Sequence, residues 1–89
     1  MTLKIETASD GRTATLRLIG RIESAYLGEI RAELRRHRLR LVFDLDQVTL
    51  VDGDVVRFLI ACEAEGIELL HGSPYIREWM DREREEPKP

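Results

Sequence analysis

Four stretches of the chain alternate between apolar and polar residues, which is the pattern of strands with one buried face. They lie at Leu3 to Glu6, Ala14 to Ile19, Leu39 to Leu45 and Ile67 to His71. The first two flank Asp10-Gly11, and Asp-Gly is a strong turn signal, so they predict an N-terminal antiparallel hairpin. Because each stretch has one mainly aliphatic face, we expect the helices to cover mainly one face of the sheet.

Helical spacing of apolar residues predicts three helices. They are expected at Ser24 to Arg36, at about Asp54 to Ala64, and from Ser73-Pro74 onward. Ser24 or Glu23 is expected to cap the first helix, and Pro74 fits the first position of the third. The order β-β-α-β-α-β-α predicts parallel strands joined by right-handed crossovers. Together with the hairpin, this gives an α/β domain with a mixed four-stranded sheet.

The 89 residues are enough for one small domain, which we assign to 1–83, followed by a charged tail at 84–89 that is expected to be flexible. A net charge of -3 and a pI near 5.4 argue against a general nucleic-acid binder. No apolar run approaches the roughly 20 residues that span a membrane, and the N-terminus lacks a signal-peptide core. These features predict a cytoplasmic protein without membrane insertion.

An acidic connection lies between the third strand and the second helix. Its carboxylates are Asp44, Asp46, Asp52 and Asp54. Magnesium prefers such oxygens, but no calcium-loop spacing accompanies them, so capping, turn formation and partner recognition are the expected roles. The lone Cys62 lies in an apolar helix and is expected in the core. Without a catalytic motif or a Gly-rich phosphate loop, the sequence predicts no enzyme, no cofactor and no metal.

Three segments, in this order of elements, resemble the STAS domain family, the fold of bacterial anti-sigma factor antagonists. They are Leu18 to Glu23, Leu41 to Asp46, and Val48 to Asp52 with the apolar helix and Glu65 to Leu69 behind it. The resemblance covers nearly all of residues 3 to 83. It implies a protein-interaction module in signalling and regulation of transcription.

The chain departs from the family at its switch. The family usually has Asp-Ser-Ser/Thr-Gly at the start of the second helix, and in antagonists a partner kinase phosphorylates the first serine. Here Asp52 matches the aspartate, but Gly53, Asp54 and Val55 follow it. Gly53 has no hydroxyl, so this position is a degenerate phosphorylation site. Asp54 either imitates the phosphorylated state or simply stabilises the helix N-terminus, where Gly53 permits a tight backbone.

The resemblance implies that this corner binds the partner, without the usual phosphoregulation. The residues expected to bind it are Glu23, Thr49, Asp52, Gly53, Asp54, Val56 and Arg57. Two partner classes fit: an anti-sigma, kinase-like ATP-binding protein, or the ATPase of an ABC-type lipid transporter with this domain as accessory subunit. A third reading is a small-ligand sensor with a pocket near Asp52. A thin apolar strip on the second sheet face (Ile19, Val42, Leu70) is compatible with a monomer or a weak dimer.

Overall fold

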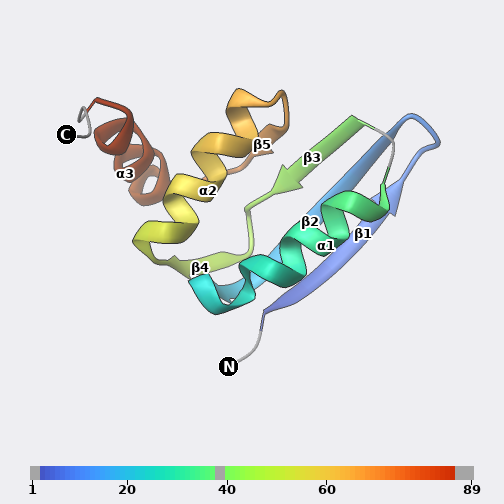
Figure 1. The fold of residues 1–89 in the computed structure, drawn as a ribbon, viewed down its shortest axis with the longest axis horizontal. Helices are drawn as coiled ribbons and strands as arrows, with labels where there is room; N and C mark the ends of the chain where they lie inside the picture. Colours follow the sequence, from blue (N-terminus) through green and yellow to red (C-terminus); the bar gives the residue numbers. More distant parts are fainter. Residues whose placement is uncertain (1–2, 38–39, 86–89) are drawn as a thin grey trace.

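A computed structural model describes residues 3–37 and 40–85. Within these ranges the chain forms five strands and three α-helices (Figure 1). The strands are β1 (Lys4–Ser9), β2 (Thr13–Ile22), β3 (Arg40–Asp44), β4 (Val48–Val51) and β5 (Glu68–Leu70). The helices are α1 (Leu27–Arg36), α2 (Gly53–Ala64) and α3 (Pro74–Glu85), with a 3-10 turn, η1 (Ser24–Tyr26), before α1. None of the described helices is long and apolar enough to cross a membrane.

The sheet is mixed, as the sequence predicts. β1 and β2 form the antiparallel hairpin, and β2, β3 and β5 follow as parallel neighbours. The predicted number of four strands is wrong, because β4 adds a fifth strand that pairs in parallel with β2. β4 has only four residues and shows no clean alternation in burial, so its sequence reads as a connection.

Besides β1, β2 pairs with both β3 and β4, because it bends at Gly20. Its first part pairs with β3, its last residues pair with β4, and the register shifts between Gly20 and Arg21. Gly20 has φ +99, a conformation that glycine adopts without the Cβ penalty of other residues. Its N–H donates to the carbonyl of Gln47 at 3.0 Å. The strand therefore continues to Ile22, beyond the predicted stretch of Ala14 to Ile19, and brings Ile22 beside Val51.

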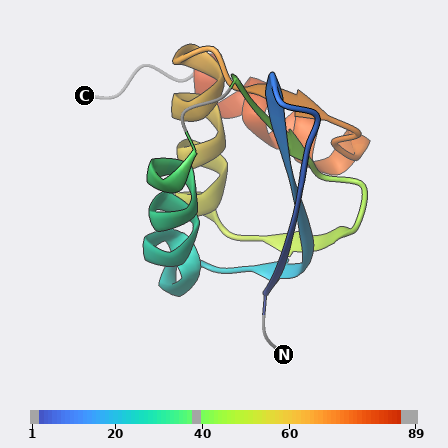
Figure 2. The same ribbon diagram turned by 90° about the vertical axis from the view of Figure 1, so that its right-hand side faces the viewer.

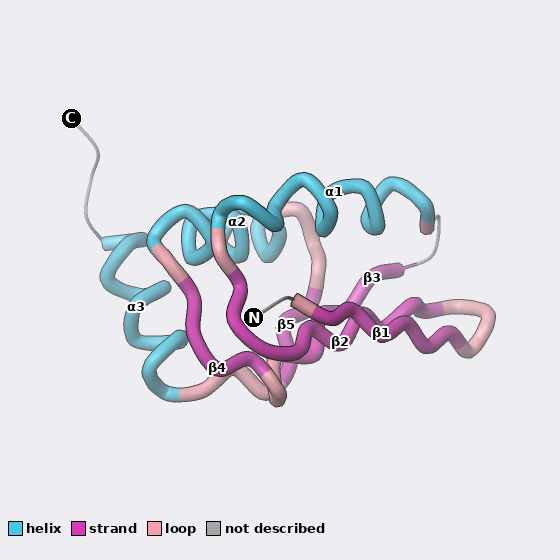
Figure 3. The backbone as a smooth tube through the Cα atoms, turned by 90° about the horizontal axis from the view of Figure 1, so that it is seen from below, coloured by secondary structure: helices cyan, strands magenta, loops and turns pink. Residues whose placement is uncertain are grey.

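α1 and α2 cover one face of the sheet, as expected, and α3 packs against α2 at the side of the sheet away from β1 (Figures 1 and 3). The largest fully buried side chains come from strands and helices alike: Leu16, Leu18, Ile22, Ile30, Phe43, Val55, Val56, Leu59, Ile76 and Met80. α2 is buried on more than one side, so it lies centrally in the core. Cys62 is buried with it, and burial raises the pKa of its thiol to about 11.

α3 begins where the sequence predicts, because the Ser73 hydroxyl oxygen accepts a hydrogen bond from the Ile76 N–H at 3.3 Å. The helix also closes one edge of the sheet: the Arg77 guanidinium donates to the carbonyl of Leu69 in β5 at 3.0 Å. α3 runs through Glu85, so the first two residues of the expected tail are helical. The rest of that tail, 86–89, lies outside the described residues.

Replacing Gly20 with alanine is expected to lower the free energy of unfolding by about 1–3 kcal/mol, because an L-residue at this positive φ is strained. Urea unfolding followed by Trp79 fluorescence measures the change. The control is Gly28→Ala in α1, where an added Cβ meets open space and helix propensity favours alanine. Equal stability of the two variants would show that the bend does not depend on glycine.

Candidate functional site

Asp52 holds the start of α2 against the start of the helical segment after β2. It is the N-cap of α2, and its Oδ1 accepts a hydrogen bond from the Val55 N–H at 3.0 Å. Its Oδ2 accepts a second bond, from the Ser24 N–H, at 2.8 Å. Neither Ser24 nor Glu23 caps its own helical segment with its side chain, contrary to the expectation from sequence. One carboxylate thus satisfies amide groups of both segments.

The same bonds set the ionisation of Asp52. Partial burial raises the pKa of its carboxyl, but the hydrogen bonds from Val55 and Ser24 lower it more, and the net pKa lies below the ordinary 3.8. The folded state therefore favours the carboxylate over the acid. The anion sits at the N-terminus of α2, where the helix dipole also favours negative charge.

Asp54 is exposed, but its charge is paired. Its Oδ1 lies 2.6 Å from Nη2 of Arg57, and Nη1 of Arg57 lies 3.4 Å from Oε1 of Glu83 in α3. The bond to Asp54, with a smaller contribution from Glu83, raises the pKa of Arg57 despite some desolvation. Arg57 therefore pairs with the negative charge of Asp54 in the first turn of α2.

Gly53 is the first residue of α2. A Cβ built on it would lie 3.5 Å from both Nη1 and Nη2 of Arg57, which is ordinary van der Waals contact. The glycines with positive φ among the described residues are Gly11, Gly20 and Gly66. The backbone at Gly53 thus does not require glycine, contrary to the tight-backbone explanation, and an added Cβ fits there.

The other predicted binding residues divide between surface and core. Thr49 is exposed, and Glu23 lines a shallow depression of about 320 Å³ together with Leu50 and Asp52. Val56 is 0% exposed, so it packs in the core and cannot contact a partner; its assignment from sequence is corrected. Its burial follows from its place on α2, which has core on more than one side.

Leu50 is the feature of this corner that sequence reasoning did not single out. It is 46% exposed, and of the large hydrophobic side chains described only Tyr75, at 47%, is comparably exposed. Its position opposite Arg21 of β2 turns it to solvent, whereas Val51 next to it is buried opposite Ile22. The sequence carries no signal for this exposure, because Thr49 and Leu50 are both exposed and the burial of β4 does not alternate.

Asp44 does not join this corner. It lies on the uncovered face of the sheet, where its Oδ1 is 3.0 Å from Nδ1 of His71 and accepts the Asp46 N–H at 3.0 Å. Burial raises the pKa of Asp44, but these two bonds and nearby Arg17 have the larger, opposite effect, and the net pKa lies below its ordinary value. Among the described residues, no group of three His, Cys, Asp or Glu side chains has an arrangement that could hold a metal ion.

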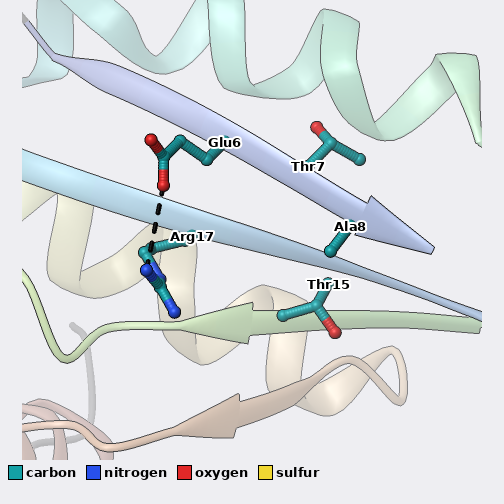
Figure 4. A pocket seen from close by; sticks show the side chains of 5 residues that line it. All are labelled: Glu6, Thr7, Ala8, Thr15 and Arg17. Atoms are coloured by element: carbon teal, nitrogen blue, oxygen red, sulfur yellow. Dashed lines mark ion pairs between the residues drawn. The ribbon is translucent and has the colours of Figure 1, made fainter.

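A larger depression, of about 530 Å³, lies along the β1–β2 hairpin (Figure 4). It is lined by Glu6, Thr7, Ala8, Thr15 and Arg17 from the β1–β2 hairpin. The figure shows Glu6 and Arg17 pointing toward one another, and their charged atoms lie 3.8 Å apart. The depression contains none of the residues predicted to bind a partner.

Replacing Asp52 with asparagine is expected to lower the free energy of unfolding by about 1–2 kcal/mol near neutral pH, because the amide cannot accept both bonds. Since the folded-state pKa of Asp52 is lowered, its stabilisation is present above about pH 4 and is lost as the pH falls through the folded-state pKa. Urea unfolding at about pH 7 and about pH 3 therefore shows a smaller difference between wild type and variant at the lower pH.

The control for this experiment is Asp46→Asn, because Asp46 is exposed and its side chain accepts only from the neighbouring Gln47 in the bonds described. Its stability is expected to stay within about 0.5 kcal/mol of wild type at neutral pH. If Asp52→Asn lowered the stability equally at both pH values, Asp52 would not act as an ionised carboxylate that accepts two hydrogen bonds.

Comparison with known proteins adds a structural likeness. The structure of the anti-sigma factor antagonist SpoIIAA in its unphosphorylated form matches with a TM-score of 0.67 and 17% sequence identity, covering 93% of this chain and 81% of that one. No family model matches the sequence, and no curated protein matches it. At this identity the likeness concerns the fold. The chain therefore has the STAS-like fold found in an anti-sigma factor antagonist.

Proposed function

We propose that this protein is a non-enzymatic STAS-domain regulator that binds another cytoplasmic protein and is not controlled by phosphate at the family's usual position. The fold supports this proposal, since the structurally similar SpoIIAA is an anti-sigma factor antagonist. The binding site is the corner surface, defined as Glu23, Thr49, Leu50, Asp54 and Arg57. The partner is a kinase-like, ATP-binding anti-sigma protein.

Exposed Leu50 is the observation that carries this assignment. Protein interfaces combine an apolar centre with a polar rim, and Leu50 supplies the apolar centre beside the half-buried Glu23. Asp54 and Arg57 supply paired charges, with the Asp54 side chain exposed. Asp52 joins the segment that begins at Ser24 to the start of α2 through its two hydrogen bonds. The side chains of the corner surface are therefore held in place before a partner binds.

Gly53 prevents phosphorylation at position 53 from switching partner binding off. Phosphorylation of an interface residue adds about two negative charges and thereby breaks or creates contacts. Glycine cannot accept phosphate, so this route of control is closed. The protein then acts through its abundance or through a change in its partner.

Replacing Leu50 with aspartate is expected to abolish capture of the partner. Tagged wild type, purified from its native host, should retain a kinase-like ATP-binding protein, identified by mass spectrometry, that is at least about tenfold depleted with Leu50→Asp. The matched control is Tyr75→Asp on α3, which has the same exposure but lies outside the corner surface. Circular dichroism verifies that both variants are folded.

Three outcomes would contradict the proposal. The first is the absence of any retained protein, and the second is equal retention by wild type and Leu50→Asp. Recovery of a transporter ATPase, lost with Leu50→Asp, would keep the corner surface but replace sigma regulation with a transport role.

Replacing Gly53 with serine is expected to leave the fold intact and to add a hydroxyl beside Arg57. Stability should rise by up to about 0.5 kcal/mol, because serine has a better helix propensity than glycine. Incubation with the recovered kinase-like partner and ATP, followed by intact-mass measurement, should add phosphate to Gly53→Ser and none to wild type. Phosphorylation of wild type within the corner would contradict the proposal.

A further inference from the structure

The two edge strands of the β1-β2-β3-β5 sheet differ in whether another element packs against them. β5 is closed by α3, whose Arg77 donates to a β5 carbonyl. β1 forms the opposite edge and pairs only with β2 among the described strands. Figures 1 and 2 show no other element beyond the outer side of β1. An uncovered edge strand has free N–H and C=O groups that can pair with another strand.

The side chains of β1 make one pairing self-complementary. Lys4 and Glu6 lie on the uncovered face of the sheet, with side chains 68% and 46% exposed. Ile5, between them, points to the opposite face and packs against the core. A positive, an apolar and a negative residue therefore follow one another along the edge. In an antiparallel second copy the order is reversed, so each charge meets the opposite charge.

We propose that two copies of this chain pair through antiparallel β1 strands, with Ile5 on the two-fold axis. This register sets Lys4 of each copy opposite Glu6 of the other, giving two opposite-charge cross-strand pairs. Ile5 meets its own copy, and Leu3 meets Thr7. Opposed residues in an antiparallel pair share a face, so the helices of both copies lie on the same side of one continuous sheet.

Neighbouring registers lack this match. A two-fold axis at Glu6 sets the two Glu6 carboxylates directly opposite each other, which is destabilising. An axis at Thr7 sets Glu6 opposite Ala8. Lys4 then lies opposite Asp10, which is beyond the end of β1 in the hairpin turn and already accepts hydrogen bonds from the Arg12 and Thr13 N–H groups. Charge therefore selects the axis at Ile5. Within its own chain, Glu6 lies 3.3 Å from Lys4 and 3.8 Å from Arg17 on β2 (Figure 4), so each cross-strand pair adds to an ion pair already present on the edge.

Charge exchange tests this pairing. Sedimentation velocity over a range of concentrations should show a reversible dimer for wild type. Lys4→Glu and Glu6→Lys should each raise its dissociation constant about tenfold, since each creates two like-charge pairs. The double variant Lys4→Glu/Glu6→Lys should restore it. Arg12→Glu, in the exposed hairpin turn, carries the same charge change as Lys4→Glu and should leave the dimer unchanged.

Cysteine cross-linking assigns the register. Cα atoms of directly opposed antiparallel residues are about 4.5–5.5 Å apart, within disulfide range. Ile5→Cys should therefore give a disulfide-linked dimer under mild oxidation, while Thr7→Cys should not. A protein that stays monomeric at its highest soluble concentration would overturn the proposal. So would dimers indifferent to the charge exchange, or cross-linking by Thr7→Cys in preference to Ile5→Cys.

Discussion

The two hydrogen bonds accepted by Asp52 are the constraint on which the proposed binding corner depends. The chain leaves β2 and enters η1 and α1 at Ser24, and it leaves β4 and enters α2 at Gly53. Both departures leave backbone N–H groups without helical partners. A single carboxylate satisfies one from each, so the two segments are fixed relative to each other. This explains why an aspartate is needed here even though no chemistry is assigned to it.

The bend in β2 is the second requirement, and it places the corner where it is. Without the positive φ of Gly20, β2 could not turn from β3 toward β4 within one strand. The bend brings Ile22 beside Val51. The residues that follow these two in the chain are Glu23 and Asp52, which therefore also lie in the corner. Val51, opposite Ile22, takes the buried position, and its neighbour Leu50, opposite Arg21, is therefore exposed.

Much of the fold follows from the sequence because its signals are local. The Asp10-Gly11 turn, the Ser73 cap and the apolar surface of α2 each depend on residues close in the chain. β4 was missed because four residues give no measurable period, and the pairing that makes them a strand is with β2, far away in sequence. The cap for Ser24 was missed for the same reason: its acceptor is Asp52, 28 residues later. The place of the corner was predictable, but the exposure of Leu50 and the burial of Val56 depend on packing.

We propose that the corner surface binds a protein in its unmodified form. Hydrogen exchange of the protein alone and in complex with its recovered partner tests it most directly, because protection reports which amides the partner shields. We expect slower exchange at residues 21–24 and 49–57 in the complex, with residues 13–17 of β2 unchanged and no phosphate present by mass. Slower exchange confined to α3 or to the β1–β2 hairpin, with the corner unchanged, would contradict it.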